Sequence, residues 1–261
     1  MGLGQRVGRQ MGRQMARAIG LWAVASLLTA CVPMMQTSPV VYPPVQTAPP
    51  PPAPGAYSGP ARLSPELAAR NFLAVVARIE PVAERFCRER NPQANCDFLI
   101  YVDDRINQPP NAFQSLDPNG RPMLGFTVAL IAEARNADEI AFVVGHESAH
   151  HVAGHIPQTQ RTAMTGAILA GILAQASGAA PEAVRSAQEM GAAMGARTYA
   201  RNFELEADAI GTEIAYAAGY DPVRGAAFFD RLPDPGDQFL GTHPPNAQRK
   251  EAVRRAAATL R

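Results

Sequence analysis

The sequence predicts a mainly helical α+β fold, with a small β-sheet beside a histidine-bearing helix. Apolar residues recur at helical spacing through most of the chain after residue 64, and only two short runs have the composition of β-strands. The chain has 261 residues, 47% of them hydrophobic, which suffices for one domain with a sizeable core and additional tails. The formal charge of +1 gives no reason to expect nucleic-acid binding.

Residues 1–30 have the layout of a secretory signal. Four arginines precede an apolar run at 18–30, which is shorter than the roughly 20 residues that span a bilayer. The small residues before Cys31 resemble the lipobox of bacterial lipoproteins, which implies cleavage before Cys31 and attachment of lipid to it. Because Val32 follows instead of an aspartate, the resemblance implies anchoring at the outer membrane, on its periplasmic face. The alternative is an ordinary signal peptide followed by an unrelated cysteine.

Residues 31–61 are rich in proline and are expected to form a disordered, semi-rigid tether, because such a stretch cannot pack a core. A proline motif that binds a partner is the alternative. The folded domain is therefore predicted to comprise residues 62–261.

The first helix of this domain is predicted to begin after Ser64, since serine caps helix N-termini and the following proline and glutamate suit a first turn. Pro81 is expected to kink or end this helix. Cys87 and Cys96 then flank an Asn-Pro turn, and in an exported chain such a close pair is expected to form a disulfide. A catalytic thiol is the alternative, although nothing nearby supports it.

Two strands are predicted next, at 97–102 and 123–128, and the turn residues between them allow them to pair through a long loop. A helix then begins after Asn136 and ends near Gly154. Residues 162–200 are rich in Ala, Gly and Met and are predicted to form a helical hairpin, with an exposed gripping surface as the alternative. Two further helices follow, the last of them at 247–260.

The helix after Asn136 carries His146-Glu147-Ser148-Ala149-His150, an HExxH motif. Residues four apart on a helix lie one above the other, so both imidazoles can face one metal ion. Glu147 lies about 100° further round the helix, where it can act on a ligand of the ion without binding it. The alternative is two structural histidines beside an unrelated glutamate.

Two more histidines follow this motif, and neither is predicted to bind the metal. The longer motif of metzincin proteases places a third histidine at the position of Ile156, so His155 is not a ligand by that route. His151 points about 100° away from His150 and is expected at the surface or behind the ligands.

A third ligand is expected from a carboxylate, because catalytic zinc usually keeps three protein ligands and two histidines commonly pair with a carboxylate. Glu204 and Asp208 are four residues apart and share a helix face, whereas Glu206 is turned about 200° from Glu204. This arrangement fits one carboxylate on the metal and a second that orients a ligand histidine. Glu206 is interpreted as part of a solvated helix face.

These motifs resemble those of the zinc metalloproteases related to HtpX and the CAAX prenyl protease, most closely the soluble periplasmic lipoprotein members. The resemblance rests on HExxH, on Glu-x-x-x-Asp within 201–208, and on Thr242-His243-Pro244-Pro245 with Arg249. It implies a compact metalloprotease domain with one Zn²⁺ ion per chain. It also implies roles for individual residues: His146, His150 and Glu204 as zinc ligands, Glu147 as general base, and Asp208 as the partner of a ligand histidine. Ala200 replaces a serine common in the family, outside the ligand set.

The resemblance leaves two roles open for His243. In some periplasmic relatives this histidine reaches the zinc and holds the enzyme inactive, and its other implied role is to bind substrate or stabilise the transition state. A structural histidine in a proline turn is the alternative.

The expected function is zinc-dependent hydrolysis of peptide bonds in misfolded cell-envelope proteins, through zinc-bound water activated by Glu147. Extended substrate is expected to pair with an edge strand such as 123–128. The alternative is an envelope chaperone or assembly factor with a latent or self-inhibited zinc site, acting with outer-membrane assembly machinery. Hydrolysis of a non-peptide amide is a third option.

Overall fold

The computed structural model describes residues 62–105, 107–236 and 243–260. The predicted signal, the tether and Cys31 lie outside these residues, so the lipid anchor and the domain boundaries stay predictions. Within the described ranges, no helix combines the length and the apolar character that crossing a bilayer requires. The described chain is mainly helical and contains one three-stranded sheet, which confirms the predicted α+β class.

Helix α1 (Pro65–Arg90) begins at the predicted cap, where the side chain of Ser64 accepts a hydrogen bond from the backbone N–H of Leu67. Pro81 lies inside this helix and does not end it. The helix continues because its buried face continues on both sides of the proline and packs against α3 (Ala137–Val152). That face consists of Ala68, Phe72, Val75, Ile79, Ala83 and Cys87.

A disulfide joins Cys87, near the end of α1, to Cys96, in the segment that leads to the sheet. The two Cα atoms are 5.7 Å apart. Cys87 is fully buried and Cys96 nearly so, so the bridge belongs to the core and fixes the chain between α1 and the first strand.

The sheet has the order β1-β3-β2, formed by β1 (Leu99–Asp103), β2 (Ala112–Leu116) and β3 (Pro122–Thr127). The two predicted strands do pair, in parallel, and β2 is an additional strand that pairs antiparallel with β3. The expectation that 123–128 forms an edge is wrong, because β1 and β2 occupy both sides of β3. The edges of this sheet are β1 and β2.

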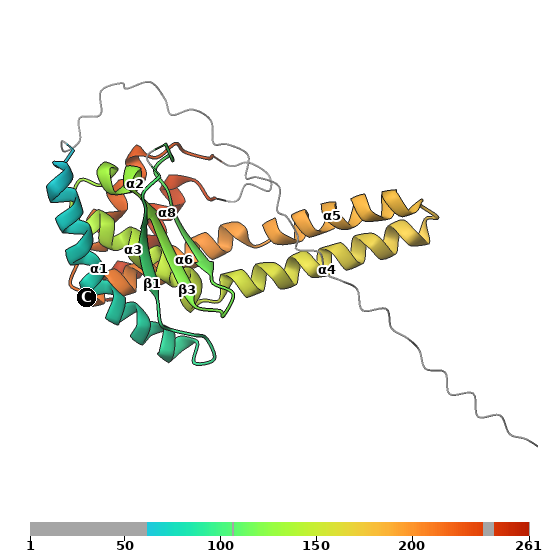
Figure 1. Cartoon of the computed structure of the whole chain (residues 1–261), viewed down its shortest axis with the longest axis horizontal. Helices are drawn as coiled ribbons and strands as arrows, with labels where there is room; N and C mark the ends of the chain where they lie inside the picture. Colours follow the sequence, from blue (N-terminus) through green and yellow to red (C-terminus); the bar gives the residue numbers. More distant parts are fainter. Residues whose placement is uncertain (1–61, 106, 237–242, 261) are drawn as a thin grey trace, which may run out of the picture. The chain divides into compact units, whose positions relative to one another are not determined.

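Helices cover one face of the sheet, as Figure 1 shows. Helix α3 is buried along almost its whole length, between α1, α6 (Ala200–Ala217) and the sheet. Shorter elements complete this layer: α2 (Val128–Glu133), α7 (Pro222–Gly225), the 3₁₀-helix η1 (Ala226–Arg231) and α8 (Asn246–Ala258). Helix α8 packs on α6, the helix that carries Glu204 and the residues after it.

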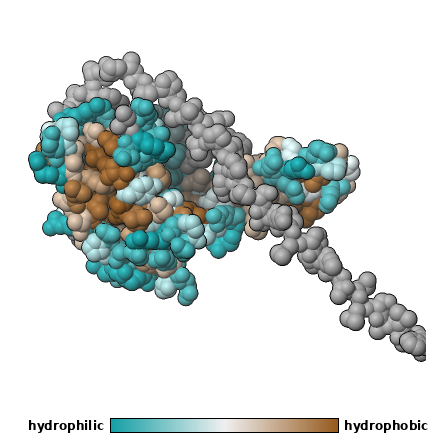
Figure 2. Space-filling view, in the orientation of Figure 1, coloured by the Kyte–Doolittle hydropathy of each residue, from teal (hydrophilic) through white to brown (hydrophobic). Residues whose placement is uncertain are grey.

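The predicted helical hairpin is formed by α4 (His155–Ala176) and α5 (Pro181–Arg197), which extend away from the rest of the domain (Figure 1). The two backbones touch, since a Cβ atom at Gly166 would lie 2.1 Å from the carbonyl oxygen of Gly191. Gly154, with φ 69°, separates α3 from α4. The face of the hairpin seen in Figure 2 is mainly hydrophilic, with hydrophobic residues at its lower edge. Large apolar side chains of the hairpin are exposed, namely Met164, Ile168, Leu169, Ile172, Leu173, Met190 and Met194.

Candidate metal centre

Helices α3 and α6 cross with their backbones in contact. A Cβ atom at Gly145 would lie 2.7 Å from the carbonyl oxygen of Gly211, and one at Gly211 would lie 2.8 Å from the backbone nitrogen of His146. No side chain fits between the helices at such distances. Glycine at both positions therefore lets α3 carry His146 directly against the helix that carries Glu204 and Asp208.

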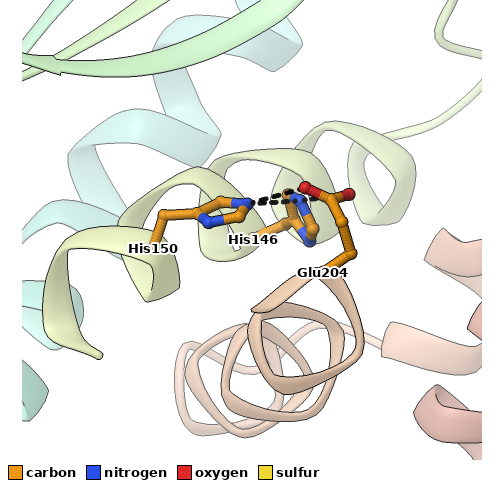
Figure 3. Close-up of side chains that lie close together, drawn as sticks. All are labelled: His146, His150 and Glu204. Carbon is orange, nitrogen blue, oxygen red and sulfur yellow. Dashed lines mark hydrogen bonds and ion pairs between the residues drawn. The ribbon is translucent and has the colours of Figure 1, made fainter. Parts of the chain in front are cut away.

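His146, His150 and Glu204 converge at this crossing, as Figure 3 shows, with one possible ligand atom from each within 4.8 Å of the others. The Nε2 atoms of the two histidines are 3.1 Å apart. They lie 3.7 Å and 3.3 Å from the two oxygens of the Glu204 carboxylate. Two imidazoles and a carboxylate are a common ligand set of catalytic zinc. The donors present therefore fit a zinc ion.

We expect Gly145→Ala to weaken zinc binding and to lower the free energy of unfolding by about 1–3 kcal/mol, because the added methyl must push α6 away from the ligand histidines. Competition with a chromophoric chelator measures the first effect and urea unfolding the second. Asn202→Ala, at an exposed position of α6, is the control and is expected to change neither. A Gly145→Ala variant with wild-type zinc affinity would show that the close crossing does not set the ligand geometry.

Glu147 is buried beside His146 and lies outside the group of three converging ligands. Its charge nevertheless acts on the site. Burial lowers the pKa of His150, but the hydrogen bond with Glu204 and the negative charges of Glu147 and Glu204 outweigh it and raise that pKa above its ordinary value. A carboxylate this close to the ligands, yet not one of them, suits a base that acts on a ligand of the ion.

Asp208 holds the other nitrogen of His146, since its Oδ1 lies 2.9 Å from Nδ1 of that ring. Asp208 is fully buried and also forms a two-point ion pair with Arg249, at 2.8 Å from Nε and 2.7 Å from Nη2. Arg249 in turn lies 3.3 Å from the Glu204 carboxylate and 4.2 Å over the ring of Phe229. The position of Asp208 thus suits the role implied for it, as the partner of a ligand histidine.

Both carboxylates are held ionised. Burial raises the pKa of the Glu204 carboxyl, but the surrounding histidines and Arg249 outweigh it, and the pKa lies well below its usual range. For Asp208, burial is likewise outweighed by the hydrogen bonds from His146 and Arg249, so its pKa is lowered. The site thus presents Glu204 as an anion ready to bind a cation.

Sequence reasoning did not assign a role to Arg249. It lies in a helix of basic composition, where an arginine is expected to face solvent, yet its residue exposure is only 8%. The one signal that could have identified it is that Arg249 belongs to the motifs that carry the family resemblance. It lies three residues after Asn246, which follows the His-Pro-Pro segment.

His243 reaches the edge of the site. Its Nδ1 lies 3.2 Å from Oε2 of Glu204, while 58% of its side chain is exposed. The structure therefore brings this histidine to a candidate ligand.

The remaining two histidines are both buried. His151 is not at the surface, because its Nε2 lies 2.7 Å from the backbone oxygen of Asn95 and its ring packs edge-on against Phe98. It is also not a partner of a candidate ligand, since these contacts join α3 to the segment before β1. His155 lies outside the group of converging ligands, and it contacts His150 and Glu206. Burial and the charge of His150 lower the pKa of His155 to about 4.

Two comparisons with known proteins bear on this site. Residues 73–257 match the model of a family described as Peptidase family M48. The mitochondrial metalloendopeptidase OMA1 of Arabidopsis thaliana is 32% identical over 156 residues, which make up 58% of this chain and 30% of that protein. The matched part thus spans less than a third of the length of this curated relative.

Proposed function

The chain belongs to peptidase family M48, and from this premise we propose that it is a zinc-dependent endopeptidase. The observation that carries the proposal is the convergence of His146, His150 and Glu204 from two crossing helices. A zinc ion held by these residues would act as a Lewis acid and would lower the pKa of bound water from 15.7 to about 7. The similarity to a metalloendopeptidase supports hydrolysis within a chain.

Glu147 is the general base in this proposal. Its carboxylate accepts the proton of the attacking water and then gives it to the amine that leaves the cleaved peptide bond. Asp208 and Arg249 take no part in the proton transfer. They hold the ring of His146 in place, because Asp208 accepts the hydrogen bond of its Nδ1–H and Arg249 fixes Asp208.

We infer that extended peptide substrate pairs with strand β2. This strand is an edge of the sheet and packs against α3, the helix with HExxH. An edge strand offers free backbone N–H and C=O groups, which bind an extended chain without regard to its side chains. Such pairing suits unfolded or misfolded proteins as substrates.

The proposed substrates are proteins of the cell envelope, and the protein is proposed to be anchored by lipid at the periplasmic face of the outer membrane. The predicted signal and Cys31 are the basis of this proposal. The disulfide between Cys87 and Cys96 supports it, because disulfides persist in oxidising compartments such as the periplasm. Contact with the outer-membrane assembly machinery is part of the same proposal.

The function is tested with the purified protein and an unfolded, reduced protein substrate. We expect cleavage by the protein as prepared with zinc, loss of cleavage after a chelator such as 1,10-phenanthroline, and recovery when zinc is added back. Mass spectrometry of the products identifies the cleaved bonds. Glu204→Ala, which removes one candidate ligand, is expected to abolish both zinc binding and cleavage. Cleavage that survives complete zinc removal would contradict the proposal.

We propose an active-site role for His243, on the basis of its contact with Glu204. His243→Ala is expected to raise the rate of cleavage if the histidine restrains the site. It lowers the rate about 10²-fold or more if the histidine stabilises the transition state, as loss of one oxyanion donor does. Steady-state kinetics and zinc affinity are measured together. A variant in which both equal the wild-type values excludes either role.

A further inference from the structure

His150 contacts a second histidine on the side away from the metal centre. Its Nδ1 lies 2.8 Å from Nδ1 of His155, and Nε2 of His155 lies 3.3 Å from Oε2 of Glu206. His155 is 3% exposed, and its ring stacks on Phe203 with the centroids 4.4 Å apart and the planes at 17°. The ring is therefore held in one orientation, with each nitrogen against a partner.

The chemistry of the two rings fixes the order of donors and acceptors. The Nε2 atom of His150 faces His146 and Glu204, so it must be free of a proton to bind a metal. Its Nδ1 then carries the proton and donates to Nδ1 of His155. The remaining nitrogen of His155 carries a proton in turn and donates to the carboxylate of Glu206.

We propose that His155 and Glu206 are positioning residues that fix His150 in the tautomer and orientation that bind the metal. This inference rests on the proposed zinc site and deepens it. The two ligand histidines are then held in different ways, because His146 contacts a buried carboxylate directly and His150 contacts a half-exposed one through an intervening imidazole. A ligand histidine commonly donates its second N–H to such an outer partner.

The test compares zinc affinity in two variants of His155. His155→Phe keeps a ring that can stack on Phe203 but removes both nitrogens, and it is expected to weaken zinc binding about 10- to 100-fold. His155→Asn returns an oxygen acceptor near the position of Nδ1 and is expected to recover part of this loss. Affinity is measured by competition with a chromophoric chelator, and far-ultraviolet circular dichroism of the zinc-free proteins verifies that they are folded.

A second readout is independent of both zinc and activity. Long-range ¹H–¹⁵N correlation spectra of the zinc-free protein report which nitrogen of each histidine carries the proton. The wild-type protein is expected to show a proton on Nδ1 of His150, and His155→Phe is expected to lower the share of His150 rings that carry one, because the proton then stays on Nε2 beside Glu204. A merely structural role for His155 would leave the tautomer of His150 unchanged.

Glu206 offers a test at a surface position, since 54% of its side chain is exposed and its loss should not prevent folding. Glu206→Ala is expected to weaken zinc binding less than His155→Phe, because water can replace an exposed carboxylate. Glu213→Ala is the matched control, since Glu213 lies on the same helix and pairs with Arg90 instead of a histidine. We expect wild-type zinc affinity in this control.

The outcomes separate this inference from the proposed function. If wild-type protein does not bind zinc, both are overturned. If it binds zinc and His155→Phe matches it in affinity and in the tautomer of His150, the inference alone is overturned. Should His155→Phe fail to fold, the comparison of Glu206→Ala with Glu213→Ala decides, and equal zinc affinities in that pair overturn the inference.

Discussion

Replacing Glu147 by glutamine is expected to lower the rate of peptide hydrolysis about 10²- to 10⁴-fold, the usual contribution of a general base. Zinc affinity should change little, because Glu147 lies outside the three converging ligands. Glutamine keeps the shape of the side chain but cannot accept the proton of the attacking water. Single-turnover cleavage of an unfolded protein and chelator competition measure the two quantities on the same samples.

The control for this variant is Glu204→Ala, which is expected to lose zinc as well as activity. The comparison also addresses the alternative function of an envelope chaperone. If wild-type protein and Glu147→Gln both bind an unfolded protein with zinc in place, and neither cleaves it, the chain acts as a binding protein with a latent metal site. Cleavage by Glu147→Gln at the wild-type rate would remove Glu147 from the mechanism.

Replacing Arg249 by methionine is expected to lower the free energy of unfolding by about 3–5 kcal/mol, the range for breaking a buried ion pair by removing one partner. Asp208 is fully buried, and Arg249 supplies two of its hydrogen bonds. Methionine fills much of the volume of arginine but leaves the carboxylate without its counter-charge. Urea unfolding of the zinc-free protein measures the loss without a contribution from metal binding.

The double variant Asp208→Asn/Arg249→Met is expected to lose less stability than Arg249→Met alone, since it no longer buries an unpaired charge. Arg254→Met is the control on the same helix, because Arg254 forms an exposed pair with Glu251 that contributes about 1 kcal/mol or less. If Arg249→Met is as mild as this control, the pair of Arg249 with Asp208 does not stabilise the site.

The parts of the site that depend on local geometry could be predicted from the sequence. The spacing of His146 and His150 on one helix, and of Glu204 and Asp208 on another, fixes which side chains share a face. The relation between these two helices could not be derived in the same way. This relation depends on the contact of Gly145 with Gly211, which the periodicity of apolar residues does not reveal. The resemblance to a known family supplied the relation instead.

The sheet shows the same limit. The strand β3 has a clear composition, but its place in the centre depends on β2, whose residues Ala112–Leu116 show no alternating pattern. Likewise, the chemistry of Pro81 predicted that α1 would kink or end at this residue. The helix does not end there, because the packing of its buried face against the core outweighs one lost hydrogen bond.

His155 was set aside because the metzincin motif places its third histidine at the position of Ile156, and helix geometry could not place a ring beyond the end of α3. Gly154, with φ 69°, ends α3 as predicted, and the left-handed turn there brings His155 back beside His150. The angles that describe α3 therefore say nothing about where this ring lies. The interpretation of Glu206 as part of a solvated helix face agrees with its 54% exposed side chain, but its contact with His155 was not predicted.

The hairpin of α4 and α5 separates the two halves of the metal site along the chain. More than fifty residues lie between His150 and Glu204, yet the hairpin leaves α3 and returns to α6 beside its own start. The hairpin therefore connects α3 to α6 as a short loop would, and its length does not affect how these two helices lie at the metal centre. Matched insertions or deletions at its far end, around residues 177–180, are expected to alter the reach of the hairpin while the ligands keep their positions. The catalytic core and this arm can accordingly change independently of each other.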